Sequence, residues 1–332
     1  MAEGSQVAIS TPSSVREQLL ERRVRLEQAI STAPAEAQFS QLLREVDSAL
    51  ERVANGSYGL CETCHDPIEA ERLAANPLLR LCLGHLTPRE QRALEDDLQL
   101  ASRIQNNLLP AKELRVGGWS ACYHYEAFGP VSGDYCDLIP AAGEVLYFVL
   151  GDVAGKGIAA SMLMSQLHAM FRTLITLGLA PDDLLERANR IFCETALSTH
   201  YATVICGRAQ PDGAVHLANA GHCPPLLLCG DQVSALESTG LPLGMFGNSQ
   251  YGSVHLKLVA GDGLLLYTDG ISESCDGSGQ EYGAERLTRA AAHHAQFGPQ
   301  QLVRGCLEDL GTFARGAARN DDLSVLAVAR AA

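Results

Sequence analysis

The sequence has no uninterrupted apolar run of about 18 residues, the minimum expected of a membrane-spanning helix. Its first ten residues, MAEGSQVAIS, lack the basic start and the apolar run of a secretion signal. Basic residues are scarce, with 25 Lys and Arg against 39 Asp and Glu, and the formal net charge is −14. We therefore expect a cytoplasmic protein with no membrane contact. The acidic balance argues against nucleic-acid binding, which requires a basic face.

Eleven cysteines are present in a chain of 332 residues. Without an export signal, this number indicates a reducing compartment in which some thiols bind metal, rather than a disulfide framework. Hydrophobic residues make up 46% of the chain and charged residues 19%, which is typical of a folded globular protein. The length predicts one medium domain and one small domain, since a single core rarely exceeds about 250–300 residues.

The spacing of apolar residues predicts helices in the N-terminal part of the chain and an α/β region in the C-terminal part. Residues 14–31 and 34–54 carry apolar side chains at helical spacing, and the STAP break between them predicts an antiparallel hairpin. Thr87-Pro88-Arg89-Glu90 is a capping box with proline at the first helical position, and it opens a helix predicted to reach Leu109. From about residue 118, strands alternate with helices. Strands are predicted at 145–150, 201–209, 214–218 and 264–267, and helices at 158–177, 181–197 and 299–313.

Two Cys/His pairs have the spacing of a structural zinc site. Cys61 and Cys64 are separated by two residues, as are Cys82 and His85, and seventeen residues lie between the pairs. Each pair can bend around one ion, and three thiolates with one imidazole fill a tetrahedral shell without an open position for catalysis. Four unconnected reduced residues are the alternative, but a chance match to both pairs is rare. The spacing therefore predicts one structural Zn²⁺.

This region, YGLCETCHDPIEAERLAANPLLRLCLGH at 58–85, resembles the DksA/TraR zinc-finger family. The shared core consists of Pro67, Ile68, Arg72, Leu73 and Pro77. His85 stands where the common form has a fourth cysteine. Family members that act on RNA polymerase carry acidic residues at the tip of a helical hairpin, and here the tip offers only Glu36. The hairpin tip therefore argues against transcriptional activity by this route. We expect the module to be a sensor or a docking platform for a regulatory partner.

Four segments of the second half place carboxylates at strand ends or in glycine-rich turns. They are VSGDYCD (Asp134, Asp137), GDVAGKG (Asp152), YTDG (Asp269) and NDDLS (Asp321, Asp322). Ionised carboxylates at the ends of buried strands cost free energy unless a cation neutralises their charge. Mg²⁺ and Mn²⁺ prefer carboxylate oxygens. One Asp-Gly alone would indicate a turn, but four such segments predict a site for a pair of divalent cations.

Together with RIQNNLLP (103–110), ANAGHCPPLLL (218–228) and GLPLG (240–244), these segments resemble the PPM family of metal-dependent protein phosphatases, in its bacterial SpoIIE/RsbU-type branch. The resemblance covers about residues 100–330 and implies an α/β sandwich of two antiparallel sheets flanked by helices. It implies a serine/threonine protein phosphatase whose usual substrate is a phosphorylated STAS-domain anti-sigma-factor antagonist. We therefore expect a helical hairpin and zinc finger at 1–86, a linker helix at 87–110 and a phosphatase domain at 111–332.

The resemblance also implies a role for each carboxylate. Asp152 is expected to bridge two Mn²⁺ or Mg²⁺ ions, with the carbonyl of Val153 as a further ligand. Asp269 and Asp321 are expected to complete the shell of one ion, and Asp134 to serve the other. The two ions would activate a water for direct attack on phosphorus. Asp322 ranks below Asp321, because the family pattern places the ligand first in that doublet.

The residues leave several alternatives open. His222, in AGH, is either the general acid or part of a structural turn. The sequence has no Cys-x₅-Arg loop, which excludes a phosphocysteine mechanism. A pseudo-phosphatase and a transcription-regulatory protein acting through the finger are the competing functions. The intact carboxylate set argues against the first, and the acidic balance and the hairpin tip argue against the second.

An apolar stripe runs along the predicted linker helix. Its members are Leu94, Leu98, Ala101, Ile104 and Leu108, spaced on average by 3.5 residues. This spacing is typical of a seam between two helices and predicts a homodimer. The alternative is that the stripe packs on its own catalytic domain. In the dimer, the linker is expected to act on the helix predicted at 158–177, which follows the bridging aspartate.

Overall fold

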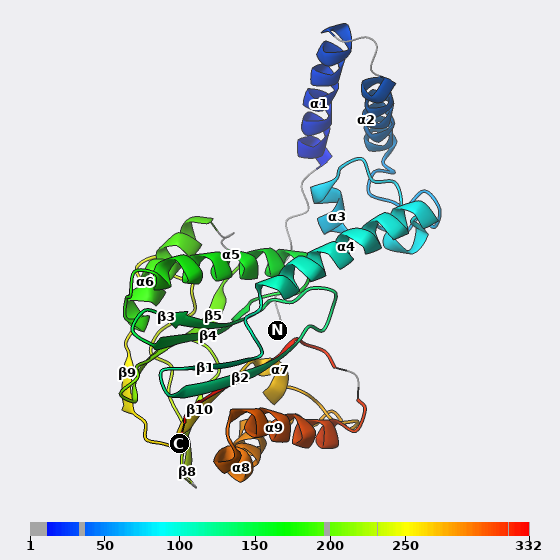
Figure 1. Cartoon of the computed structure of the whole chain (residues 1–332). Coiled ribbons are helices and arrows are strands. Elements are labelled where there is room, and N and C mark those ends of the chain that lie inside the picture. The colour runs from blue at the N-terminus through cyan, green and yellow to red at the C-terminus, as the bar shows by residue number, and fades with distance from the viewer. Residues whose placement is uncertain (1–11, 33–36, 196–199, 231, 318, 332) are drawn as a thin grey trace, which may run out of the picture. The chain divides into compact units, whose positions relative to one another are not determined.

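The computed structural model describes residues 12–32, 37–195, 200–230, 232–317 and 319–331 (Figure 1). The chain forms two compact units, one reaching Asp96 and the other starting at Asp97. The division lies within α4 (Pro88–Leu108), so the predicted linker helix contributes residues to both units. None of the helices in these described ranges is long and apolar enough to cross a lipid bilayer.

Helices α1 (Pro12–Thr32) and α2 (Ala37–Asn55) lie side by side in the first unit, as the sequence predicts (Figure 1). A small core of Val15, Leu19 and Ala49 holds them together. Residues 33–36, which include Glu36 of the predicted hairpin tip, are outside the described residues. Two short elements follow, α3 (Ala70–Ala75) and the 3₁₀ turn η1 (Leu83–His85).

The capping box predicted at the start of α4 is present. The Glu90 carboxylate accepts hydrogen bonds from the Thr87 backbone N–H at 2.9 Å and from the Thr87 hydroxyl at 2.6 Å. The Glu90 N–H donates in return to Thr87 Oγ1 at 3.3 Å. These contacts satisfy N–H groups that the first helical turn leaves unpaired, and they set the start of α4 at Pro88.

The second unit is a sandwich of two antiparallel sheets, which confirms the predicted fold. One sheet has the order β1 (Glu113–Val116), β2 (Trp119–Glu126), β11 (Leu323–Arg330), β10 (Gly263–Tyr267), β7 (Leu226–Cys229), β8 (Gln232–Ala235). The other has the order β3 (Asp134–Ala141), β4 (Val145–Val153), β5 (Ala202–Ala209), β6 (Ala214–Ala220), β9 (Val254–Lys257).

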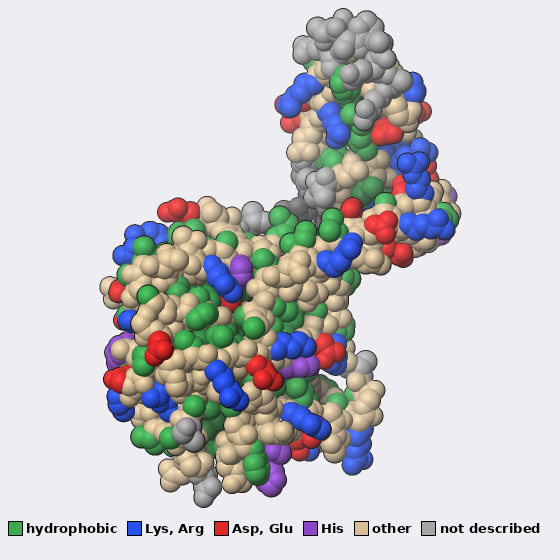
Figure 2. Space-filling view, viewed as in Figure 1, with side chains coloured by type: hydrophobic (Ala, Val, Ile, Leu, Met, Phe, Trp, Pro, Cys, Tyr) green, Lys and Arg blue, Asp and Glu red, His purple; other side chains and the backbone are tan. Residues whose placement is uncertain are grey.

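Helices cover the outer face of each sheet (Figure 1). The β3–β9 sheet carries α5 (Ile158–Ile175) and α6 (Pro181–Thr195), while α8 (Ala284–His294) and α9 (Pro299–Ala314) lie against the other sheet. Within the described residues, the strands and helices expected from periodicity are all present to within a few residues at their ends. On the face shown in Figure 2, the acidic and basic side chains drawn over this unit are intermixed.

Strand β4 is buried along almost its whole length because both of its faces are covered. Tyr147 and Val149 belong to the core beneath α5 and α6. Leu146, Phe148 and Leu150 belong to the core between the two sheets. A strand packed on both sides has little freedom to shift, and Asp152 stands at its end.

Candidate active site and zinc site

The carboxylates predicted from the four motifs come from ends of strands in both sheets. Asp134 opens β3, and in the β3–β4 ladder it lies opposite Asp152, near the end of β4. In the other sheet, Asp269 follows β10 and starts the short helix α7 (Asp269–Ser272), and Asp321 precedes the neighbouring strand β11. The side chains of Asp152, Asp269 and Asp321 line one cavity of about 300 Å³. Residues more than 160 positions apart in sequence are thus brought to one place.

Burial and charge repulsion together disfavour the ionised carboxylates in this cavity. Burial, followed by the charges of Asp269 and Asp321, raises the pKa of Asp152 to about 7. Burial and Asp321 also raise the pKa of Asp269. Among the described residues that line the cavity, Lys156 is the sole Lys or Arg, and its Nζ lies 2.8 Å from Asp321 Oδ2. Three carboxylates against one ammonium fit a site for hard divalent cations, which would offset the remaining charge.

The backbone beside Asp152 leaves room for two of the expected ligand oxygens. A Cβ placed on Gly133 would lie 3.1 Å from the carbonyl oxygen of Val153 and 3.4 Å from Asp152 Oδ1. Both oxygens therefore lie close to the backbone of Gly133, which carries no side chain. A side chain at position 133 would crowd them, which gives a physical reason for glycine in the VSGDYCD motif.

Asp134 differs from the other three carboxylates. It is only 1% exposed, and its Oδ2 accepts hydrogen bonds from the hydroxyls of Thr268 at 3.1 Å and Ser324 at 2.5 Å. Burial and the charge of Asp152 raise its pKa well above the ordinary value. In this structure the carboxylate is thus held by two hydroxyl groups next to the cluster.

Asp322 has both carboxylate oxygens occupied by backbone donors. Oδ1 accepts the N–H of Phe128 at 2.7 Å, and Oδ2 accepts the N–H of Gly133 at 2.9 Å. The side chain therefore holds the segment that leads into β3 against the start of β11. This arrangement favours Asp321 over its neighbour as a metal ligand.

Asp137, from the same motif as Asp134, has a separate structural role. It is fully buried, and its carboxylate forms two hydrogen bonds with Arg172 of α5, at 2.8 and 2.7 Å. The pair fastens α5 to β3. A paired, two-pronged contact of this kind satisfies a buried carboxylate without a metal ion.

His222 lines the cavity but is itself buried, with 4% of its surface exposed. Its Nδ1 lies 2.9 Å from Thr203 Oγ1, and its backbone N–H donates to Asn219 Oδ1 at 2.7 Å. Burial lowers the pKa of His222 to about 4. An imidazole that is neutral near pH 7 is a poor proton donor. The geometry therefore favours the structural turn over the general acid.

Two residues near the site were not predicted from the sequence. Lys156 lies within GDVAGKG, two residues before α5 starts at Ile158, and only this position in the motif could have indicated that it lines the cavity. Gln105 lies within RIQNNLLP, where a glutamine on a helix surface carries no signal of burial. It is nevertheless the buried residue of α4.

The four predicted zinc ligands lie together in the first unit. One ligand atom from each of Cys61, Cys64, Cys82 and His85 lies within 4.8 Å of all the others. The Sγ atoms of Cys64 and Cys82 are 3.8 Å apart. Tetrahedral Zn²⁺ with Zn–S bonds of about 2.3 Å separates neighbouring sulfurs by about 3.8 Å. The residues therefore fit a structural zinc ion.

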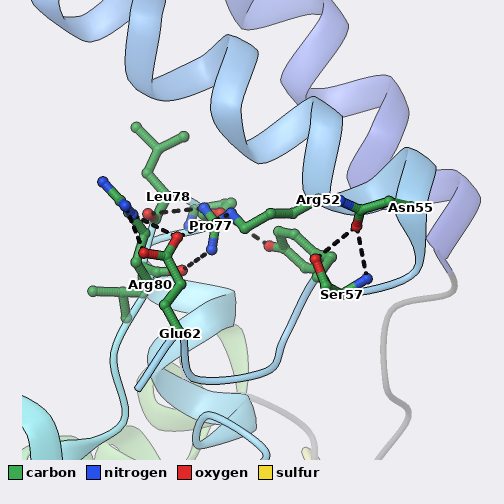
Figure 3. Close-up of polar contacts among 9 residues, drawn as sticks. Arg52, Asn55, Ser57, Glu62, Pro77, Leu78 and Arg80 are labelled. Carbon is green, nitrogen blue, oxygen red and sulfur yellow. Dashed lines mark hydrogen bonds and ion pairs between the residues drawn. The ribbon is translucent and has the colours of Figure 1, made fainter. Parts of the chain in front are cut away.

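Hydrogen bonds and ion pairs connect the two halves of the finger with each other and with α2 (Figure 3). Glu62, between Cys61 and Cys64, accepts two hydrogen bonds from Arg80, at 2.6 and 2.5 Å. Arg52 of α2 is 7% exposed and donates to the carbonyls of Leu79 at 2.8 Å and Leu78 at 3.4 Å. Residues 78–80, which lead into Cys82, are thus held both by Glu62 and by Arg52 of α2, so that the finger packs against α2.

The two-sheet sandwich with flanking helices is the fold of the PP2C class of protein phosphatases. Residues 142–331 match the family described as stage II sporulation protein E (SpoIIE), and the chain belongs to this family. Residues 56–84 match the prokaryotic dksA/traR C4-type zinc finger. The recognition of both families from sequence motifs is thereby confirmed.

The matches to individual relatives span only part of each relative's length. The chain is 31% identical over 186 residues to phosphoserine phosphatase RsbP of Bacillus subtilis, which covers 53% of this chain and 45% of RsbP. It is 25% identical over 228 residues to phosphoserine phosphatase RsbU of the same organism, covering 66% of each. The chain thus spans less than two thirds of the length of these curated relatives.

Solved structures agree on the fold. The RsbU and RsbW domains of Rv1364c from Mycobacterium tuberculosis match with a TM-score of 0.59 and 31% identity, covering 68% of this chain and 63% of that one. The SiaA-PP2C domain of Pseudomonas aeruginosa matches with a TM-score of 0.64 and 18% identity, covering 73% of this chain and 99% of that one.

Proposed function

We propose that this chain is a metal-dependent protein phosphatase that hydrolyses phosphoserine or phosphothreonine on a regulatory protein. The observation that carries the proposal is the convergence of Asp152, Asp269 and Asp321 on one cavity, within a chain that belongs to the SpoIIE family. The relatives RsbP and RsbU are phosphoserine phosphatases by name, which supports the same reaction.

In this proposal, Asp152, Asp269, Asp321, Asp134 and the carbonyl of Val153 hold two Mn²⁺ or Mg²⁺ ions. The bound ions would supply charge neutralisation and a water of lowered pKa. The residues of the chain provide the rest. Asp152 is fixed at the end of a strand packed on both faces, so the ligand oxygens are organised before the metal binds.

The decisive experiment is hydrolysis of p-nitrophenyl phosphate by the full chain with Mn²⁺, with Mg²⁺ and with a chelator. Metal-dependent release of p-nitrophenol supports the phosphatase. A purified, folded protein that binds Mn²⁺ but releases no product would instead indicate a non-catalytic interaction protein.

For the natural substrate we propose a phosphorylated STAS-domain anti-sigma-factor antagonist, on the basis of the family resemblance. The N-terminal finger would regulate the reaction as a sensor or as a docking platform for a regulatory partner. A dephosphorylation screen against phosphorylated STAS proteins from the same organism tests the substrate. Equal rates on STAS and unrelated phosphoproteins would count against it.

Lys156 is expected to bind the phosphate of the substrate. It is the sole cation among the described residues lining the cavity, with its Nζ 2.8 Å from Asp321. A hydrogen bond to a charged group contributes about 1.5–3 kcal/mol, so Lys156→Met should lower kcat/KM about 10- to 100-fold. Steady-state kinetics at saturating Mn²⁺ measure this.

The matched variant is Lys156→Arg, which keeps the charge and should retain most of the activity. The half-saturating Mn²⁺ concentration should not rise in Lys156→Met, because the ammonium competes with the metal for Asp321. A loss of activity that extra Mn²⁺ fully restores would contradict the phosphate-binding role.

We further propose that the stripe on α4 forms a homodimer. Leu94 and Ile104 are 38% and 56% exposed, so their own units leave these side chains uncovered. Leu98→Glu plus Ile104→Glu should give monomers with altered basal activity, because two charges on each helix would face each other across the seam. Sedimentation at micromolar concentration measures the change.

The control places the same charges at exposed polar positions of the same helix, as Gln99→Glu plus Asn106→Glu. This variant should stay dimeric. Wild-type protein that sediments as a monomer, with the same activity as the stripe variant, would rule out the dimer.

A further inference from the structure

Gln105 is the buried side chain of α4, at 5% exposure, on a helix that is otherwise largely solvent-facing over its described residues. Its amide forms two hydrogen bonds with one residue. Nε2 donates to the carbonyl of Ser132 at 2.7 Å, and the N–H of Ser132 donates to Oε1 at 2.9 Å. Ser132 is 1% exposed. The buried Gln105 amide thus pairs with the backbone N–H and C=O of a single residue.

Ser132 belongs to the segment that leads into the carboxylate cluster. Its hydroxyl accepts the N–H of Asp134 at 3.0 Å. The next residue, Gly133, donates to Asp322 at 2.9 Å and accepts the N–H of Val153 at 3.3 Å. Residues 132–134 therefore connect α4, the start of β11 and the end of β4.

The two-point contact is geometrically demanding. An amide can pair with both backbone groups only when it lies in their plane and at their spacing. The contact therefore fixes the rotation of this part of α4 about the helix axis and its position along that axis. An apolar side chain would fill the same volume but leave the N–H and C=O of Ser132 unpaired, which is costly in a buried place. Packing alone does not call for glutamine here.

We propose that Gln105 is a positioning residue, which holds segment 132–134 so that Asp134, Val153 and Asp152 adopt the arrangement that binds metal. Gln105 is not among the residues that line the cavity, and it acts through Ser132. The inference rests on the proposed function for its catalytic consequence, but its effect on metal binding is measured separately.

Gln105→Met is the main test, since methionine has a similar length and no hydrogen-bonding amide. Loss of a residue that orients metal ligands typically costs 10–100-fold in metal affinity or activity. We expect Mn²⁺ binding, measured by electron paramagnetic resonance of the free ion, to weaken about 10-fold or more. At saturating Mn²⁺, kcat for p-nitrophenyl phosphate should fall, with KM nearly unchanged.

Two further variants separate positioning from general destabilisation. Gln99→Met makes the same substitution at an exposed glutamine of α4 and should match wild type in every measurement. Gln105→Asn keeps the amide on a side chain one carbon shorter, so it can hold one of the two contacts and should give an intermediate Mn²⁺ affinity. All binding is measured at temperatures where circular dichroism shows each variant folded.

A folded Gln105→Met protein with wild-type Mn²⁺ affinity and wild-type kcat would overturn the proposal. So would a lower melting temperature with metal binding unchanged, because that result describes a packing role. If wild-type protein binds Mn²⁺ but hydrolyses nothing, the proposed function fails, and the metal affinities of the three variants still decide the role of Gln105.

Discussion

Asp152→Asn is expected to abolish metal-dependent phosphatase activity while leaving the catalytic unit folded. Asp152 is the carboxylate expected to contact both ions, and metal ions contribute several kcal/mol of transition-state stabilisation. A loss of at least about 100-fold follows. The metal-free variant should also melt at a higher temperature than wild type, because the substitution removes one of three negative charges that line the same cavity.

The two effects have opposite signs, which makes the measurement specific. Activity is followed with p-nitrophenyl phosphate over a range of Mn²⁺ concentrations, and melting is followed with and without Mn²⁺. Asp269→Asn should behave in the same way, and Asp183→Asn, at an exposed position of α6, should behave as wild type. Full activity in purified Asp152→Asn would refute the ligand assignment.

Removal of a zinc ligand is expected to unfold the finger without affecting the basal hydrolysis of p-nitrophenyl phosphate. Cys61→Ser or Cys82→Ser should release the ion and destabilise residues 55–90. Structural zinc contributes apparent free energies of about 10–16 kcal/mol in zinc-finger peptides. The described core of this unit is small, centred on Val15, Leu19 and Ala49, and cannot supply a comparable amount.

Metal analysis and limited proteolysis test this expectation. Wild-type protein should carry one zinc per chain, and the two variants none, with new cleavage sites between 55 and 90. Cys229→Ser, in β7 of the catalytic unit, should retain the zinc. Hydrolysis of p-nitrophenyl phosphate should be equal in all four proteins. Wild-type protein purified without chelators and free of zinc would rule out the site.

The sequence predicted the features that depend on local spacing. The candidate zinc ligands come as two pairs with fixed intervals, so the sequence alone identifies the four positions that the structure brings together. Strand β4 and helix α4 were predictable because an apolar run and a capping box report burial and helix start directly. Strand β3 was not predicted, since Asp134 and Asp137 interrupt its apolar pattern with charges.

The tertiary structure alone decided what each charged residue near the site does. Asp134, Asp137 and Asp322 look equivalent to Asp152 in sequence, yet their partners differ, and these partners lie 35 to 194 residues away along the chain. Burial, which the sequence around His222 does not report, keeps its imidazole neutral. The motifs by themselves identified the two families, and they predicted two sets of candidate metal ligands. Which carboxylates line the cavity, that Lys156 lies beside Asp321 and that Gln105 is paired with Ser132 depended on the tertiary structure, because hydrogen-bond partners are set by the packed chain and not by neighbours in sequence.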